Sequence, residues 1–476
     1  MKTVLLPSRA TPFVSFRFLF ETGSIDDPRG REGTAALAGA ALAEGGTRKL
    51  SYEQLLEALY PMAAGIGVQV DREVTVVQGT VHADHLDRYY DLVRQVLIEP
   101  RFDLKEVSRL KDDQENALVA GLRATDDEGL GKEALMAMMY AGHPYGRPVE
   151  GTVAGLQAIG RDEVVAFRDA HLTQDRLTVG LAGRFPDAFA DRVLADLAGL
   201  PTNGAVRPAL PAPKKASGME ALVVTKPARA WAISLGHPIA VTRADDDFYP
   251  LFVANSYFGE HRTFNGVLMN AMRSLRGLNY GDYSYVEAFV QDGGSTFPLP
   301  NVGRRQQAFT IWIRPVAPAH AHFATRQAVR ELRRLIESGL TRAAFEETRE
   351  FLGHYDKLWV QTPSRRLGYA MDGAFYGTGS LPEELGRRLP SMTVDDVNAA
   401  IRRHLSAENL HLAVVADPDG AGPFVEALGA NAPSPIVYET ETRPEVVIED
   451  RSIAVEKLDT DPRRCRVVPA DTMFEV

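Results

Sequence analysis

The sequence has one cysteine, no long hydrophobic run and no excess of positive charge. A lone Cys465 excludes an internal disulfide framework and a cysteine-based zinc site. The longest run of small and apolar residues, Ala35–Ala43, is far shorter than the roughly 20 residues that a membrane-spanning helix needs. The formal net charge of −10 argues against a nucleic-acid-binding protein, which normally presents a basic surface.

Sequence motifs of self-sufficient enzymes are also missing. None of the 11 histidines lies in a His-Glu-x-x-His or His-x-x-Glu-His pair, the helical motifs that place two imidazoles and a base on one face. The chain has neither a Walker phosphate loop nor a Gly-x-Ser-x-Gly nucleophile elbow. Motif content alone therefore indicates no independent enzyme.

The composition is that of an ordinary globular protein, with 45% hydrophobic and 24% charged residues among 476. Five prolines fall within Pro201–Pro227 and indicate an extended linker, because proline cannot hold a helix or a central strand. We expect an N-terminal domain over residues 1–205, a linker over 206–227, a C-terminal domain over 228–430 and a docking tail over 431–476.

The two predicted domains carry similar sequences. Ile159–Gly183 and Met392–Asp417 align without a gap at an offset of 233 residues, so that His171 matches His404. Each copy has a polar start, an amphipathic helix and an alternating strand. The match predicts two homologous domains that arose by duplication.

Strands and helices are expected in blocks, which favours an α+β fold with a mostly antiparallel sheet in each domain. In the first domain we expect strands at Phe13–Thr22 and within Gly67–His82, and helices at Glu32–Glu44, Leu86–Leu97, Leu104–Ala124 and Leu130–Tyr140. In the tail we expect strands at Ser434–Thr442 and Cys465–Val468.

The run that begins at Gly33, GTAALAGAALAEGGTRKLSYEQL, resembles the signature helix of the pitrilysin/insulinase metallopeptidases. Active members of that family have Gly-x-Ala-His-x-x-Glu-His in this stretch, followed by Gly-Thr. Here the three active positions are Ala36, Gly39 and Ala40, although Gly33 and Gly46-Thr47 fit the pattern. Three further segments resemble the family in the right order: Asp71–Val77, His143–Thr152 and Leu335–Glu346.

Active members of the family that this chain resembles bind zinc, but this chain lacks the side chains that such a site needs. The family uses two histidines and a distal carboxylate as zinc ligands, with a glutamate as general base. Alanine and glycine can neither bind a metal nor accept a proton, so we expect no metal ligand set in this chain. Glu115, near the position of the distal ligand, and Glu73 are interpreted as surface or helix-cap residues.

The second domain resembles the active family more closely. Asn270–Tyr285, NAMRSLRGLNYGDYSY, is similar to the family segment Leu-Arg-x-x-x-Gly-Leu-x-Tyr, with Met272 in place of its leucine. The resemblance implies that Arg273 holds a substrate carbonyl group and that the Tyr280 hydroxyl supports the oxyanion. Both are therefore predicted catalytic residues that act on a zinc site elsewhere.

The bacterial branch of the family includes pairs in which only one subunit carries the zinc motif, and the two subunits close like a clamshell around a peptide. The resemblance thus implies a non-catalytic subunit of a heterodimeric zinc endopeptidase that forms half of the chamber, with zinc in the homologous partner and peptides as substrates.

Two alternatives stay open at this point. The chain could be an inert scaffold or peptide-binding protein of the same fold, or a lone enzyme with an unrecognised metal site. The sequence as given predicts a cytoplasmic protein, or a periplasmic one if a leader was removed.

Overall fold

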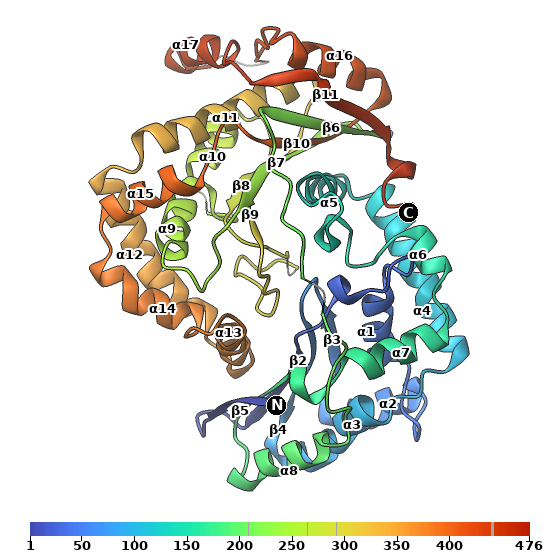
Figure 1. The fold of residues 1–476 in the computed structure, drawn as a ribbon. Helices are drawn as coiled ribbons and strands as arrows, with labels where there is room; N and C mark the ends of the chain where they lie inside the picture. Colours follow the sequence, from blue (N-terminus) through green and yellow to red (C-terminus); the bar gives the residue numbers. More distant parts are fainter. Residues whose placement is uncertain (208, 264, 292, 439–441) are drawn as a thin grey trace.

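The computed structural model describes residues 1–207, 209–263, 265–291, 293–438 and 442–476, which form two sheets surrounded by helices (Figure 1). The strands of the first sheet, in spatial order, are β1 (Lys2–Pro7), β5 (Leu177–Gly183), β2 (Phe13–Phe20), β4 (Thr75–His82) and β3 (Gly67–Val70). Those of the second sheet are β11 (Thr460–Pro469), β6 (Met219–Thr225), β10 (His411–Ala416), β7 (Trp231–Ile239), β9 (Gln307–Val316) and β8 (Asp282–Tyr285).

Helices cover these sheets. Those of the N-terminal half are α1 (Thr34–Glu44), α2 (Tyr52–Leu59), α3 (Leu86–Ile98), α4 (Leu104–Asn116), α5 (Asp127–Met139), α6 (Val153–Gln157), α7 (Arg161–His171) and α8 (Asp187–Leu197). Those of the C-terminal half are α9 (Phe248–Gly259), α10 (Val267–Met269), α11 (Ala321–Ser338), α12 (Arg342–Trp359), α13 (Pro363–Tyr376), α14 (Leu381–Arg388), α15 (Val394–His404), α16 (Pro418–Gly429) and α17 (Pro444–Ile453).

The topology confirms the predicted α+β class and the duplication. The order β1-β5-β2-β4-β3 is repeated as β6-β10-β7-β9-β8, with β11 added at the outer edge of the second sheet. In both sheets the first strand of the repeat pairs in parallel with its fifth, and the remaining pairs of the repeat are antiparallel. The matched segments of the sequence correspond to α7–β5 and α15–β10.

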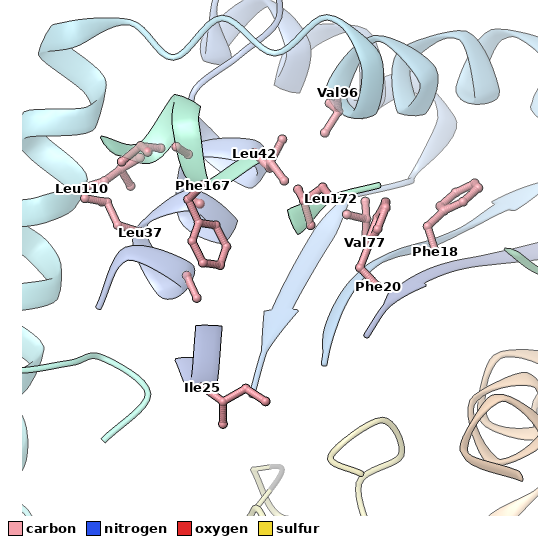
Figure 2. Packing of buried hydrophobic residues seen from close by; sticks show 14 of the residues in the cluster. Phe18, Phe20, Ile25, Leu37, Leu42, Val77, Val96, Leu110, Phe167 and Leu172 are labelled. Atoms are coloured by element: carbon pink, nitrogen blue, oxygen red, sulfur yellow. The ribbon is translucent and has the colours of Figure 1, made fainter. Parts of the chain in front are cut away.

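One face of the first sheet packs against α1 and its neighbours. Alternate residues of β2, among them Phe18 and Phe20, point to this face because successive side chains of a strand alternate. Leu37 and Leu42 of α1 and Phe167 of α7 fill the same core (Figure 2). The motif helix is therefore fixed by its leucines, together with the buried Ala35, Ala38 and Ala41.

The other face of each sheet is covered by a helix from the other half of the chain. Helix α5 packs on β7 and β10, and α13 packs on β2 and β5 (Figure 1). Gly180 of β5 permits the close approach of α13, since a Cβ atom there would lie 2.4 Å from Sδ of Met371. The two halves thus exchange equivalent helices.

The predicted linker at 206–227 differs from the structure in its second half. Residues Met219–Thr225 form β6, a strand buried between β10 and β11. Ala221 and Val223 face the core of the second domain, and Leu222 and Val224 face α5. Prolines are absent from this stretch, so nothing opposes strand formation there.

The C-terminal segment runs along the second sheet and ends on the first domain. Residues Cys465–Val468, expected to be strand-like, lie in β11, which pairs in parallel with β6. The strand expected at Ser434–Thr442 does not form over residues 434–438, and residues 439–441 lie outside the described part. The Val153 and Ala154 amides donate to the carbonyls of Phe474 and Glu475, at 3.1 and 2.9 Å.

No helix within the described ranges is long and apolar enough to span a bilayer.

Candidate functional site

The degenerate motif lies on α1, whose N-terminus is held by a buried carboxylate. The backbone amides of Gly33 and Ala35 donate to Asp27, at 2.8 and 2.7 Å. Burial raises the pKa of Asp27 to about 7, although these two hydrogen bonds act in the opposite direction.

The three vacant positions Ala36, Gly39 and Ala40 lie on this helix, and the space beside Gly39 is already filled. A Cβ atom at Gly39 would lie 2.4 Å from Cγ2 of Val70, on the adjacent strand β3. The side chain of a general base therefore has no room at this position unless Val70 moves.

The two retained carboxylates have different surroundings. Glu115 of α4 is partly buried, and its Oε1 lies 3.5 Å from Nε2 of Gln157. The interpretation of Glu73 as a surface or cap residue is wrong, because its side chain is fully buried. Glu73 accepts hydrogen bonds from the Tyr145 hydroxyl and from the amide and guanidinium of Arg305. Tyr145 belongs to the first domain and Arg305 to the second, so Glu73 links the two domains. A buried carboxylate needs several such donors.

These residues do not fit a zinc site. The part of the chain that the structure describes contains no group of three or more histidine, cysteine, aspartate or glutamate side chains that could hold a metal ion. Ala36, Gly39 and Ala40 contribute no ligand atom, and Glu73 is committed to Arg305. The other predicted site residues, Arg273 and Tyr280, lie in the second domain.

The structure places Arg273 and Tyr280 side by side. Arg273 lies in a π-helical turn, Asn270–Ser274, that continues α10, and Tyr280 lies in the loop before β8. The guanidinium carbon of Arg273 lies 4.8 Å from the centroid of the Tyr280 ring, which is cation–π distance. The Tyr280 side chain is 70% exposed, so it is accessible to another molecule.

A third side chain, which the sequence gave no reason to expect, borders this pair. Arg314 of β9 lies 5.6 Å from the Tyr280 ring centroid on a strand that pairs with β8. Its Nε donates to Glu128 of α5 at 3.0 Å. The Arg273–Tyr280 pair is thus tied to a helix of the first domain, a contact that no local sequence pattern could indicate.

The segment that carries the pair is anchored by the C-terminal helix. The fully buried Arg276 donates from Nε to Asp450 and from a terminal nitrogen to Glu449, both at 2.8 Å, and from its other terminal nitrogen to the Ala271 carbonyl. Asp450 and Glu449 belong to α17. A guanidinium can hold several acceptors in fixed directions, so this contact fixes the turn between Arg273 and Tyr280.

Comparison with known families agrees with the fold and with the vacant motif. Residues 3–153 match the insulinase family model, peptidase family M16, and residues 158–352 match the model of the M16 peptidase inactive domain. The chain belongs to the insulinase (M16) peptidase family. The matches to these two models confirm the resemblance seen at Gly33 and in the segments after it.

Its relatives include proteins described as uncharacterized zinc proteases. One from Streptomyces coelicolor is 25% identical over 78% of this chain and 79% of its own length. One from Mycobacterium tuberculosis is 24% identical over 76% and 73%. One from Bacillus subtilis is 21% identical over 52% of this chain and 59% of its own length, less than two thirds of that relative.

Solved structures share the fold of this M16 chain. A structure described as a peptidase M16 inactive domain from Pseudomonas fluorescens has a TM-score of 0.76 and 20% identity, over 87% of this chain and 95% of that one. A protease from Helicobacter pylori has a TM-score of 0.73 and 14% identity, over 87% and 96%. At these identities the likeness concerns the fold alone.

Proposed function

We propose that this chain is the zinc-less subunit of a two-subunit M16 endopeptidase and that it supplies Arg273 and Tyr280 to the active site of a zinc-bearing homologue. One observation carries the proposal. The chain combines an adjacent Arg–Tyr pair, in which Tyr280 is exposed and Arg273 is half-buried, with a motif helix that has no ligand and no base. Among the described residues of its own chain, the pair has no group of metal ligands on which it would act.

The chemistry of the pair suits peptide hydrolysis. Attack on a peptide carbonyl places negative charge on its oxygen, and a donor already held in position stabilises that charge. The Tyr280 hydroxyl would donate to this oxygen, and Arg273 would hold a neighbouring substrate carbonyl through its fixed fork of N–H groups. The zinc ion and the general base would belong to the partner subunit.

The relatives are described as zinc proteases, which supports a role of this chain in peptide hydrolysis. When two subunits meet, the half-chamber formed by this chain would close over a peptide. A pull-down of this chain from its own cells at native abundance tests the assembly. We expect a stoichiometric partner of similar length that carries His-x-x-Glu-His. Recovery of the chain alone, or within a larger membrane complex, would favour the scaffold alternative.

Substitution of the tyrosine tests the role of the pair. Tyr280→Phe removes one oxyanion donor, so we expect the kcat of the assembled pair to fall about 10²–10³-fold while assembly is unchanged. Tyr60→Phe is a matched control, because Tyr60 is 85% exposed and lies on the first domain. Unchanged turnover of Tyr280→Phe would exclude the assigned role.

A further inference from the structure

A cavity of about 310 Å³ lies where the two domains meet. Its wall is formed by the end of β3 and the turn after it, by α5, by residues 149–150, by residues 287–290 after β8, by the segment that leads into β9 and by β9 itself. This volume is near the lower limit for a ligand pocket and suits one or two side chains of a peptide.

One end of the cavity combines a lysine with aromatic rings. The ammonium of Lys132, on α5, lies 3.9 Å from the ring centroid of Trp312, on β9. The Trp312 ring lies 4.1 Å from that of Tyr285 and 6.2 Å from that of Phe289. Aromatic faces stabilise an ammonium only in part, so this cation lacks a full counter-charge.

The acidic residues near Lys132 on α5 and at its N-cap are all engaged by other groups. The four contacts are Asp126 with the Gly129 amide, Asp127 with Lys226, Glu128 with Arg314 and Glu133 with Arg72. Within the described ranges the structure gives Lys132 no salt bridge and no hydrogen bond. Burial lowers the pKa of Lys132, although the nearby carboxylates of Glu128, Asp126 and Glu133 act in the opposite direction.

The cavity lies near the Arg–Tyr pair along β9 and α5, although neither residue of the pair lines it. Trp312 and Arg314 are two residues apart on β9 and therefore lie on the same face of the strand. Glu128 and Lys132 are four residues apart on α5 and lie one turn apart on one face. Arg314 borders Tyr280, so a peptide held at Tyr280 could place a nearby group in the cavity.

We propose that this cavity binds a carboxylate of a peptide, with Lys132 as its cationic partner and with Trp312 and Phe289 packed against the adjoining aliphatic carbons. The proposal rests on the proposed function for its setting, a peptide chamber, but the binding itself needs neither zinc nor a partner. The carboxylate could belong to an acidic side chain or to the C-terminus of the peptide.

The cavity wall also carries four carboxylates, those of Asp71, Glu133, Glu150 and Glu287. Three of them form ion pairs: Asp71 with Arg304, Glu133 with Arg72 and Glu287 with Arg243. Glu150 interacts electrostatically with Glu133, Arg72 and Asp71. A bound carboxylate would approach the Lys132 end, and Glu150 would oppose it weakly. Glu150→Gln is therefore expected to strengthen the binding of a carboxylate.

Tryptophan fluorescence of the isolated chain measures the binding directly. Of the three tryptophans, Trp231 and Trp359 are only 2% and 0% exposed, whereas Trp312 lines the cavity. The probes are three N-acetylated hexapeptides: one with a central glutamate and an amidated C-terminus, one with glutamine in its place, and the glutamine peptide with a free C-terminal carboxylate. We expect one carboxylate peptide to bind at least about tenfold more tightly than the neutral one, because hydrogen bonds to charged groups are stronger.

Variants at Lys132 decide the assignment. Lys132→Gln should abolish the carboxylate preference, and Lys132→Arg should retain most of it. Lys215→Gln, at an exposed lysine in the segment before β6, should leave it unchanged. Equal binding of all three peptides, no binding of any, or a preference that survives Lys132→Gln would overturn the proposal.

The outcome is separable from that of the proposed function. Tyr280→Phe is expected to lower the turnover of the assembled pair without changing the carboxylate preference of the isolated chain. A failure of the peptidase assignment would leave the fluorescence result standing, and the reverse also holds.

Discussion

At the scale of single residues, Gly39 explains why the vacant motif cannot be restored by one substitution. The position of the base is a glycine, and Val70 fills the space beside it. A protein interior is packed as densely as a crystal, so a lost functional group is soon replaced by neighbouring atoms.

Gly39 and Val70 should therefore be energetically coupled. We expect Gly39→Ala to lower the free energy of unfolding by about 1–3 kcal/mol, because the new methyl group overlaps Val70. In a Val70→Ala background the same change should raise it by up to about 1 kcal/mol, since alanine favours the helix over glycine. Denaturant unfolding of the four proteins measures the cycle, and the same sign in both backgrounds would contradict the predicted overlap.

His237 shows how a buried residue can be tied to one protonation state. Its Nδ1 lies 3.1 Å from the Pro238 carbonyl and must donate, whereas its Nε2 accepts from the Ser406 amide at 3.1 Å. Only the neutral imidazole satisfies both contacts. Burial lowers the pKa of His237 to about 4.

This protonation state makes stability depend on pH in a defined direction. The unfolded chain binds a proton at His237 below about pH 6.5 and the folded chain only below about pH 4, so acidification between these values favours unfolding. We expect His237→Gln to remove up to about 1.4 kcal/mol per pH unit from the slope of unfolding free energy in this range. Unfolding curves at pH 4.5, 5.5 and 6.5 measure the slope, with His85→Gln at an exposed site as control. A slope equal to that of the wild type would refute the assignment.

At the scale of elements, α17 holds the segment that presents Arg273 and Tyr280. Arg276 and Asp450 are both buried, and their contact joins residues that are far apart in the chain. Removal of one partner of a buried ion pair leaves an uncompensated charge, which is costly.

Asp450→Ala should therefore loosen this segment. We expect the free energy of unfolding to fall by about 3–5 kcal/mol. Amide hydrogen exchange over residues 270–280 should accelerate more than that of β10 in the core of the sheet. Glu445→Ala, at an exposed position of the same helix, is the control. Unchanged exchange in Asp450→Ala would show that α17 does not support the segment.

The elements also show what the sequence could predict. Strand β2 and helix α1 follow from local alternation and periodicity, and Arg273 and Tyr280 meet because a spacing of seven residues spans one short turn. The sequence does not predict strand β6, because its apolar run is buried on both faces and follows a proline-rich stretch. The burial of Glu73 and the meeting of Lys132 with Trp312 depend on contacts between domains, which no local pattern encodes.

At the scale of the whole molecule, the exchange of α5 and α13 joins the two domains into one folding unit. Leu367 and Met371 of α13 complete a cluster with Leu19 and Val76 of the first sheet. Buried polar contacts, such as that of Asp71 with Arg304, reinforce the interface. Neither half can bury both faces of its own sheet.

Residues 1–205 alone should therefore not fold cooperatively. Without α13 one face of the first sheet is exposed to water, and α5 has no sheet to cover. We expect this fragment to bind a hydrophobic dye and to lack a sharp unfolding transition. Co-expression with residues 206–476 should restore a cooperative complex. A sharp transition for the fragment alone would show that the exchanged helix is dispensable.

The exchange of helices also determines when the first sheet can be covered during synthesis of the chain. The last strand of the first sheet ends at Gly183, but the helix that covers its second face ends only at Tyr376. At about 5–20 residues per second a ribosome needs about 10–40 s to make the intervening chain. For that interval the nascent protein displays an uncovered apolar sheet, and its yield in a cell will depend on the chaperones that shield it.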